Sequence, residues 1–141
     1  MISSDSEVKN FSSTSYASGT SQLPLLGVTI GQNLRRTAST WPAADALVDL
    51  AQGMRYNYEE FDAAVDNLAR ALLGAGMAKG DRVAVWAPNC SEWVLLQYAT
   101  ARVGVILVNI NPAYRTYELQ YALNQSGSRM LFAGRRGRWS S

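Results

Sequence analysis

Between residues 79 and 132 the sequence alternates short apolar runs with longer segments of helical pattern. The apolar runs cover residues 82–87, 105–110 and 129–132. Strands that are separated by helices do not pair as tight hairpins; they form parallel sheets through right-handed crossovers. The sequence therefore predicts an α/β fold in which helices flank a partial parallel sheet.

An antiparallel hairpin is predicted upstream of this region. Residues 46–51 (ALVDLA) and residues 54–58 (MRYNY) are short runs typical of strands, and Gln52-Gly53 between them is a turn signal. Two short strands across a glycine turn favour a β-hairpin. The predicted architecture is thus a short N-terminal β-hairpin followed by the partial parallel sheet.

The helix predicted over residues 58–73 has the clearest pattern. Its apolar positions repeat at i, i+4, i+7 and i+11, which is one face of a 3.6-residue period. These positions are Phe61, Val65, Leu68 and Leu72. Acidic residues fill its first turn, where the helix dipole favours anions, so Glu59 and Glu60 are interpreted as helix-start residues and not as an acid–base pair.

Two further helix starts carry capping signals. Thr29 precedes the helical pattern of residues 29–40, and Asn89 precedes that of residues 90–103. Glu92 follows Asn89 by three positions, which is the spacing of a capping box. We therefore expect Asn89 to cap the helix that begins at Cys90.

The composition excludes several kinds of site. The chain has no histidine and one cysteine, Cys90, so it has no Ser-His-Asp or Cys-His nucleophile, no histidine-containing metal site and no internal disulfide. A helix N-terminus lowers a thiol pKa, but no base accompanies Cys90 in sequence, and we expect an inert thiol. One cysteine, with no secretory signal, predicts a cytoplasmic protein.

The charge gives no argument for a nucleic-acid or membrane partner. The net charge is +2, and without Arg135, Arg136 and Arg138 the count is 10 basic to 11 acidic residues. No apolar run approaches the roughly 20 residues that span a bilayer. A nucleic-acid binder that acts through the arginine tail remains the weakest of three functional hypotheses, because three charges give weak, salt-sensitive binding.

Several isolated motifs have simpler structural interpretations. The glycines Gly74, Gly76 and Gly80 follow a helix and precede a strand, which is the reverse of a dinucleotide fingerprint; Lys79 lies in the polar turn between them. The larger aromatic residues of this region are expected to pack in the core or between helices. They are Trp86, Trp93, Tyr98 and Tyr121.

The order of these motifs resembles the N-terminal part of AMP-forming acyl-CoA synthetases, in the adenylate-forming superfamily. The passages that carry the resemblance are RYNYEEFDAAVDNLARALLGAGMAKGDRVAVWAPNCSEW and ILVNINPAYRTYEL, and PLLGVTI at residues 24–30 resembles the medium-chain branch. The resemblance covers about residues 15–132. It predicts residues 21–132 as an incomplete N-terminal subdomain, after a flexible leader at residues 1–20 and before a non-family basic tail at residues 133–141.

The resemblance implies a two-step reaction for full-length members. A fatty acid attacks the α-phosphate of ATP, with Mg²⁺, to give an acyl-adenylate and pyrophosphate, and coenzyme A then displaces AMP. The phosphate loop and the catalytic lysine of the family lie beyond the matched region, and neither Lys9 nor Lys79 matches that lysine. No catalytic, cofactor-binding or metal-binding residue is therefore assigned in this chain.

The break in the pattern at Ala133 predicts premature termination of a longer reading frame. The leading hypothesis is a family fragment without independent catalysis, which needs ATP, Mg²⁺ and coenzyme A only as part of a full-length enzyme. The alternative is a structural or interaction module that pairs with a complementary chain or with itself, because an incomplete sheet leaves an unpaired edge.

Overall fold

The parallel sheet consists of three strands with β3 in the centre. The computed structural model describes residue 19 and residues 25–134, and its sheet has the order β4-β3-β5. Val83 of β3 (Arg82–Trp86) pairs in parallel with Leu107 of β4 (Ile106–Asn109) and with Met130 of β5 (Met130–Ala133). The predicted partial parallel sheet is confirmed.

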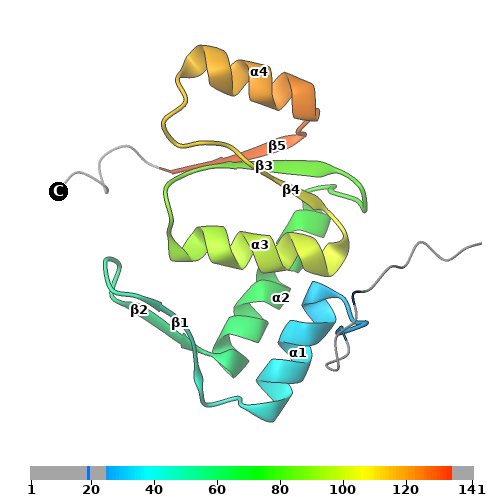
Figure 1. Cartoon of the computed structure of the whole chain (residues 1–141), viewed down its shortest axis with the longest axis vertical. Helices are drawn as coiled ribbons and strands as arrows, with labels where there is room; N and C mark the ends of the chain where they lie inside the picture. The colour runs from blue at the N-terminus through cyan, green and yellow to red at the C-terminus, as the bar shows by residue number, and fades with distance from the viewer. Residues whose placement is uncertain (1–18, 20–24, 135–141) are drawn as a thin grey trace, which may run out of the picture.

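The two crossover helices lie on opposite faces of this sheet (Figure 1). Helix α3 (Ser91–Val103) connects β3 to β4, and helix α4 (Thr116–Ser126) connects β4 back across β3 to β5. Right-handed crossovers that run in opposite directions along a sheet must use opposite faces. The return of the chain across β3 therefore fixes which face each helix covers.

The predicted hairpin is also confirmed, with a small shift. Strand β1 (Asp45–Asp49) pairs antiparallel with strand β2 (Met54–Asn57). The first strand begins and ends earlier than predicted because residues 50–53 form the turn, in which Gly53 has a positive φ of 65°. The Asp49 carboxylate accepts a hydrogen bond from the Gln52 N–H, and this bond closes the turn.

The two N-terminal helices begin at reciprocal capping boxes. Thr29 caps α1 (Ile30–Thr40) together with Gln32, as the sequence indicated for Thr29. Asn57 caps α2 (Tyr58–Gly74) together with Glu60. Glu60 thus closes a capping box in addition to its favourable interaction with the helix dipole. The sequence pattern placed Asn57 in the second strand of the hairpin and did not predict that it caps α2.

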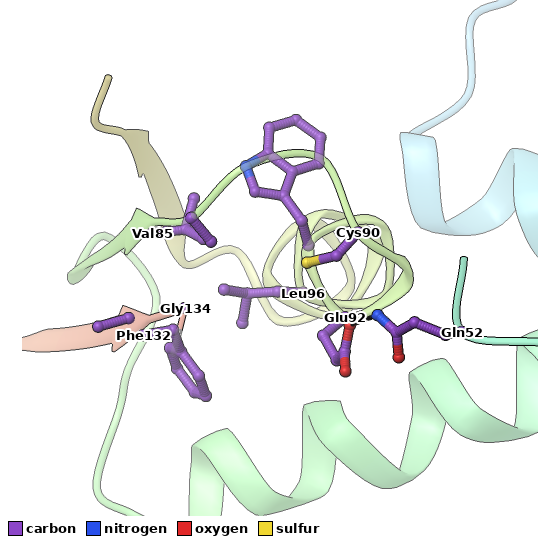
Figure 2. A pocket seen from close by; sticks show the side chains of 10 residues that line it. Gln52, Val85, Cys90, Glu92, Leu96, Phe132 and Gly134 are labelled. Carbon is purple, nitrogen blue, oxygen red and sulfur yellow. Dashed lines mark hydrogen bonds between the residues drawn. The ribbon is translucent and has the colours of Figure 1, made fainter. Parts of the chain in front are cut away.

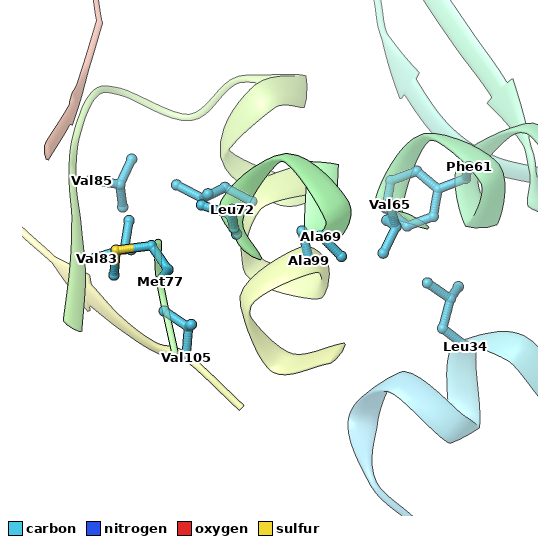
Figure 3. Packing of buried hydrophobic residues seen from close by; sticks show 11 residues of the cluster. Leu34, Phe61, Val65, Ala69, Leu72, Met77, Val83, Val85, Ala99 and Val105 are labelled. Carbon is cyan, nitrogen blue, oxygen red and sulfur yellow. The ribbon is translucent and has the colours of Figure 1, made fainter. Parts of the chain in front are cut away.

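The core joins α2, α3 and one face of the sheet (Figure 3). On α2 the predicted positions Phe61, Val65 and Leu72 are buried, but Leu68 is only half-buried and Ala69 takes the fourth place. An ideal helix drifts relative to a fixed seven-residue repeat, so the buried face of α2 includes position 69 and leaves position 68 at its border. Phe61 also makes an edge-to-face contact with Tyr98 of α3, with ring centroids 5.5 Å apart.

One predicted packing residue is exposed. Tyr121 lies on α4, and 61% of its surface is accessible. Helix α4 has no buried residue, although Leu119, Ala122 and Leu123 are half-buried. The helix therefore covers its face of the sheet loosely, and the expectation for Tyr121 is wrong because that side chain lies outside the half-buried stripe.

An ion-pair cluster ties the first three helices together. The side chain of Arg102 on α3 is only 11% exposed and pairs with Asp62 and Asp66 of α2. Arg35 of α1 also contacts Asp66, at 3.2 Å. Beside this cluster Gly31 lies so close to α3 that an added Cβ would stand 3.3 Å from the Cα of Arg102.

Hydrogen bonds within the cluster shift the pKa values of Asp66 and Arg102 in the directions that favour their charged forms. The hydrogen bond from Arg102 is the largest cause that holds the pKa of Asp66 below its ordinary value. Burial by itself would lower the pKa of Arg102, but the hydrogen bonds to Asp62 and Asp66 raise it overall. The raised pKa of Arg102 and the lowered pKa of Asp66 therefore both favour the ionised pair.

Two expectations concern residues outside the described range. The predicted leader at residues 1–20 falls outside it except for Gly19, and the predicted tail at residues 133–141 falls outside it from Arg135 onward. Both boundaries stay predictions. Among the described helices none is long and apolar enough to cross a bilayer.

We expect Arg102→Met to destabilise the fold by about 2 kcal/mol, because two carboxylates then lose their shared partner in a largely buried place. The change should appear as a lower urea midpoint at an unchanged slope. Arg55→Met is the matched control, since the Arg55–Asp45 pair is exposed on both sides and should contribute no more than about 0.5 kcal/mol. Equal shifts for the two variants would contradict the role of the cluster.

The cluster should also set the response to acid. Because the pKa of Asp66 is lowered by folding, its contribution is complete above the ordinary aspartate pKa of about 3.9 and is lost as the pH falls below it. Urea unfolding between neutral pH and about pH 2 should show a smaller loss of stability for Asp66→Asn than for the unaltered protein. Parallel pH profiles for the two proteins would exclude this contribution.

Candidate functional site

A cavity of about 380 Å³ lies beyond the carboxyl ends of β3 and β5 (Figure 2). In parallel α/β sheets this is the edge where ligands bind. The cavity is closed on one side by the first turns of α3 and on another by the hairpin turn at Gln52. It is lined by Gln52, Val85, Ala87, Cys90, Glu92, Trp93, Leu96, Phe132, Ala133 and Gly134.

Most of the wall is apolar. Val85 and Leu96 belong to the buried core, and Trp93 and Phe132 present aromatic surface to the same space. Phe132 keeps 37% of its surface exposed because nothing in the described chain covers the end of β5. The cavity is therefore an open continuation of the hydrophobic core.

Cys90 places its thiol in this wall, directly before α3. Burial is the largest cause that raises the pKa of Cys90, and the neighbouring Glu92 carboxylate raises it further. The lowering by the helix N-terminus that the sequence suggested is outweighed, because desolvation and a nearby negative charge both disfavour the thiolate. The expected inert thiol agrees with this environment.

Glu92 supplies the charged group of the cavity. Its Oε2 accepts hydrogen bonds from the Gln52 amide at 2.9 Å and from the Ser91 hydroxyl at 3.2 Å. The bond from Gln52 is the largest cause that lowers the pKa of Glu92, so this carboxylate is ionised at neutral pH. A residue of the hairpin turn thus holds the side chain of a residue on α3 and favours its ionised form.

The cap of α3 differs from the predicted one. Cys90, not Asn89, is the N-cap residue, and its side chain makes no capping hydrogen bond. The Asp49 carboxylate of β1 instead accepts the backbone N–H of Ser91 at 3.2 Å. The expectation of an Asn89–Glu92 capping box is therefore wrong. Asp49 of the hairpin accepts the hydrogen bond from the first turn of α3, and the Glu92 carboxylate accepts a hydrogen bond from Gln52.

The electrostatics of the cavity disfavour anions. Its lining contains the ionised Glu92 and, among the described residues, neither lysine nor arginine. The described residues also contain no group of three side chains suited to hold a metal ion. A triphosphate needs backbone amides or cations to balance its charge, whereas the charged side chain among the described lining residues of this cavity is the Glu92 carboxylate.

The glycines near Lys79 form a turn, as their order in the sequence indicated. Gly76 and Gly80 have positive φ values of 82° and 88° between the end of α2 and the start of β3. The Asp81 carboxylate accepts the Ala78 N–H at 2.8 Å and stabilises that turn. This turn precedes β3 and lies at the end of the strand opposite the cavity. Lys79 is therefore not one of the residues that line the cavity.

Two kinds of comparison relate the sequence to known proteins. A family model described as "AMP-binding enzyme" matches residues 34–140. The chain is 44% identical over 117 residues to the medium-chain acyl-CoA ligase ACSF2, mitochondrial, of Macaca fascicularis, and 43% identical over 107 residues to the putative acyl-CoA synthetase YngI of Bacillus subtilis. These matches cover 83% and 76% of this chain but only 19% and 20% of the relatives.

The fold has close counterparts among solved structures. The inhibitor-bound N-terminal domain of FACL13 from Mycobacterium tuberculosis superposes with a TM-score of 0.73 at 35% identity, over 75% of this chain and 27% of that domain. The described elements therefore match the beginning of a larger domain, and the chain spans about a fifth of the length of the curated relatives that it matches.

We expect Asp49→Ala to destabilise the protein by about 1 kcal/mol, since α3 loses the acceptor for its first N–H and the hairpin turn loses the acceptor for the Gln52 N–H. Asn89→Ala should stay within about 0.5 kcal/mol, because the structure gives Asn89 no capping role. Urea unfolding of the two variants measures the difference. A larger loss of stability for Asn89→Ala than for Asp49→Ala would contradict this assignment and indicate that Asn89 caps α3.

Proposed function

Because the chain belongs to the family of AMP-binding enzymes, we propose that it forms the N-terminal scaffold of an AMP-forming acyl-CoA ligase. The single observation that carries this proposal is the 44% identity with a medium-chain acyl-CoA ligase over 83% of this chain. The superposition on an N-terminal domain of a fatty acyl-CoA synthetase supports it. Residues 21–132 are the proposed scaffold region.

The proposed parent reaction has two steps. A fatty carboxylate displaces pyrophosphate from the α-phosphate of ATP, and the thiol of coenzyme A then displaces AMP from the acyl-adenylate. Mg²⁺ accompanies ATP in that reaction. Fatty acid, ATP and coenzyme A are thus partners of the parent enzyme in this proposal, and the cytoplasm is its proposed compartment, on the grounds of the single cysteine.

The role proposed for this chain is structural and not catalytic. The cavity at the sheet edge carries a carboxylate and no cation among its lining residues, whereas adenylation develops negative charge that cations and amide donors must stabilise. The chain instead supplies positioned elements: β3, two crossover helices and the docked hairpin. No catalytic, cofactor-binding or metal-binding residue is assigned within it.

We expect the purified chain to release no pyrophosphate above the blank when it is mixed with ATP, Mg²⁺, a series of fatty acids and coenzyme A. The reason is that the described lining of the cavity presents a carboxylate and no cation to the phosphate charges. A full-length acyl-CoA ligase of the same family, assayed in parallel, shows that the assay reports turnover. Pyrophosphate release by the purified chain that depends on fatty acid would overturn the scaffold role.

A second candidate function is a module that pairs with a complementary chain. The observation that favours it is the exposed end of the sheet, where Leu131 and Phe132 of β5 each keep 37% of their surface accessible. Exposed edge strands that carry apolar side chains pair readily with another chain. Co-expression with the downstream part of a ligase of this family distinguishes the two: a soluble complex with restored pyrophosphate release supports the module.

A further inference from the structure

The cavity beyond β3 and β5 lies at a topological switch point of the sheet. The chain leaves β3 for β4 through α3 on one face, and it returns across β3 to β5 through α4 on the other face (Figure 1). In open α/β sheets, ligands bind beyond the carboxyl ends of the two strands between which the chain reverses in this way. The volume of the cavity, about 380 Å³, is also in the range of small-molecule sites.

The cavity has a polar end and an apolar end (Figure 2). Gln52 and Glu92 lie together beside the hairpin turn, whereas Val85 and Phe132 lie on the side of the sheet. A ligand that fills the cavity therefore needs an apolar body with a polar group at one end only. An aromatic ring suits the apolar end, because Phe132 offers a ring for an offset or edge-to-face contact.

Glu92 decides which charge that polar group carries. Its Oε2 accepts hydrogen bonds from Gln52 at 2.9 Å and from Ser91 at 3.2 Å. An ionised carboxylate has about four acceptor sites, so Glu92 can accept a further bond from a ligand. Because the described lining contains no lysine or arginine, a cationic donor is attracted to this end, and a carboxylate or phosphate is repelled from it.

We propose that this cavity binds a small arylalkyl ammonium ion, with the ammonium group on the Glu92 carboxylate and the aromatic ring at the apolar end against Phe132. Charge at one end and apolar surface at the other select an amine over a neutral molecule of the same shape and over an organic acid. This inference goes beyond the proposed ligase scaffold and is independent of it, because it concerns a cation and not a fatty carboxylate or a nucleotide.

The test is an NMR titration of the whole chain with 2-phenylethylammonium chloride at neutral pH. We expect saturable shifts of the Gln52 side-chain amide and of the Leu96 methyl groups, which also line the cavity, at millimolar ligand, as for a small molecule held by one partly exposed ion pair. 2-Phenylethanol has the same body without the charge and should bind about fivefold more weakly. 3-Phenylpropionate should leave these signals unshifted, because its carboxylate would face that of Glu92.

Glu92→Gln should weaken the binding of the ammonium ion about fivefold and remove its advantage over the alcohol. Glu118→Gln is the matched control, since Glu118 is also an exposed glutamate in the first turn of a helix but does not line the cavity; it should leave binding unchanged. Phe132→Ala should weaken the ammonium ion and the alcohol by the same factor, because it removes apolar contact alone. The urea midpoint of each variant shows whether it is folded.

Three results would overturn the proposal. Equal affinities for the ammonium ion and the alcohol mean that the cavity does not select a charge. Unchanged binding of the ammonium ion by Glu92→Gln means that this carboxylate does not hold it. Shifts confined to residues away from the cavity, or no shifts at all, mean that the cavity is not a site for this class of ligand. None of these results bears on the ligase scaffold, which the pyrophosphate assay tests separately.

Discussion

The rest of the structure depends on the burial of β3 between two parallel neighbours. Val83, Ala84 and Val85 are all buried, so both faces of this strand need a covering layer. Because parallel neighbours cannot be joined by tight turns, the chain crosses once over each face of the sheet through α3 and α4. The same arrangement places the ends of β3 and β5 side by side, where the cavity forms.

The helical layer below the sheet is held by apolar burial and by one polar cluster. Leu34, Phe61 and Val65 bring α1 and α2 into the core, while Arg102 and its two aspartates bind α2 to α3. Apolar contacts are not directional, whereas the guanidinium fork requires both carboxylates in fixed places. The cluster therefore sets the relative position of helices that apolar packing alone would leave free to slide.

Local signals in the sequence predicted most of the elements, and non-local contacts account for the errors. The hairpin, the helix of residues 58–73 and the parallel sheet follow from period and turn chemistry, and these are confirmed. The capping role of Asn89 was wrong because an acid 42 residues away reaches the same helix end. The cavity was not predicted at all, since its lining comes from the hairpin turn, α3 and β5.

The sequence by itself determined the element order, the helix start at Thr29, the helix over residues 58–73, and the family, because capping, periodicity and motif order are read within short windows. Only the tertiary structure decided the state of the candidate site. Burial reverses the expected shift in the pKa of Cys90, and the hydrogen bond from Gln52 lowers the pKa of Glu92 in the cavity wall. Both effects depend on which groups packing brings together and how far it excludes water, and no local pattern in the sequence encodes either.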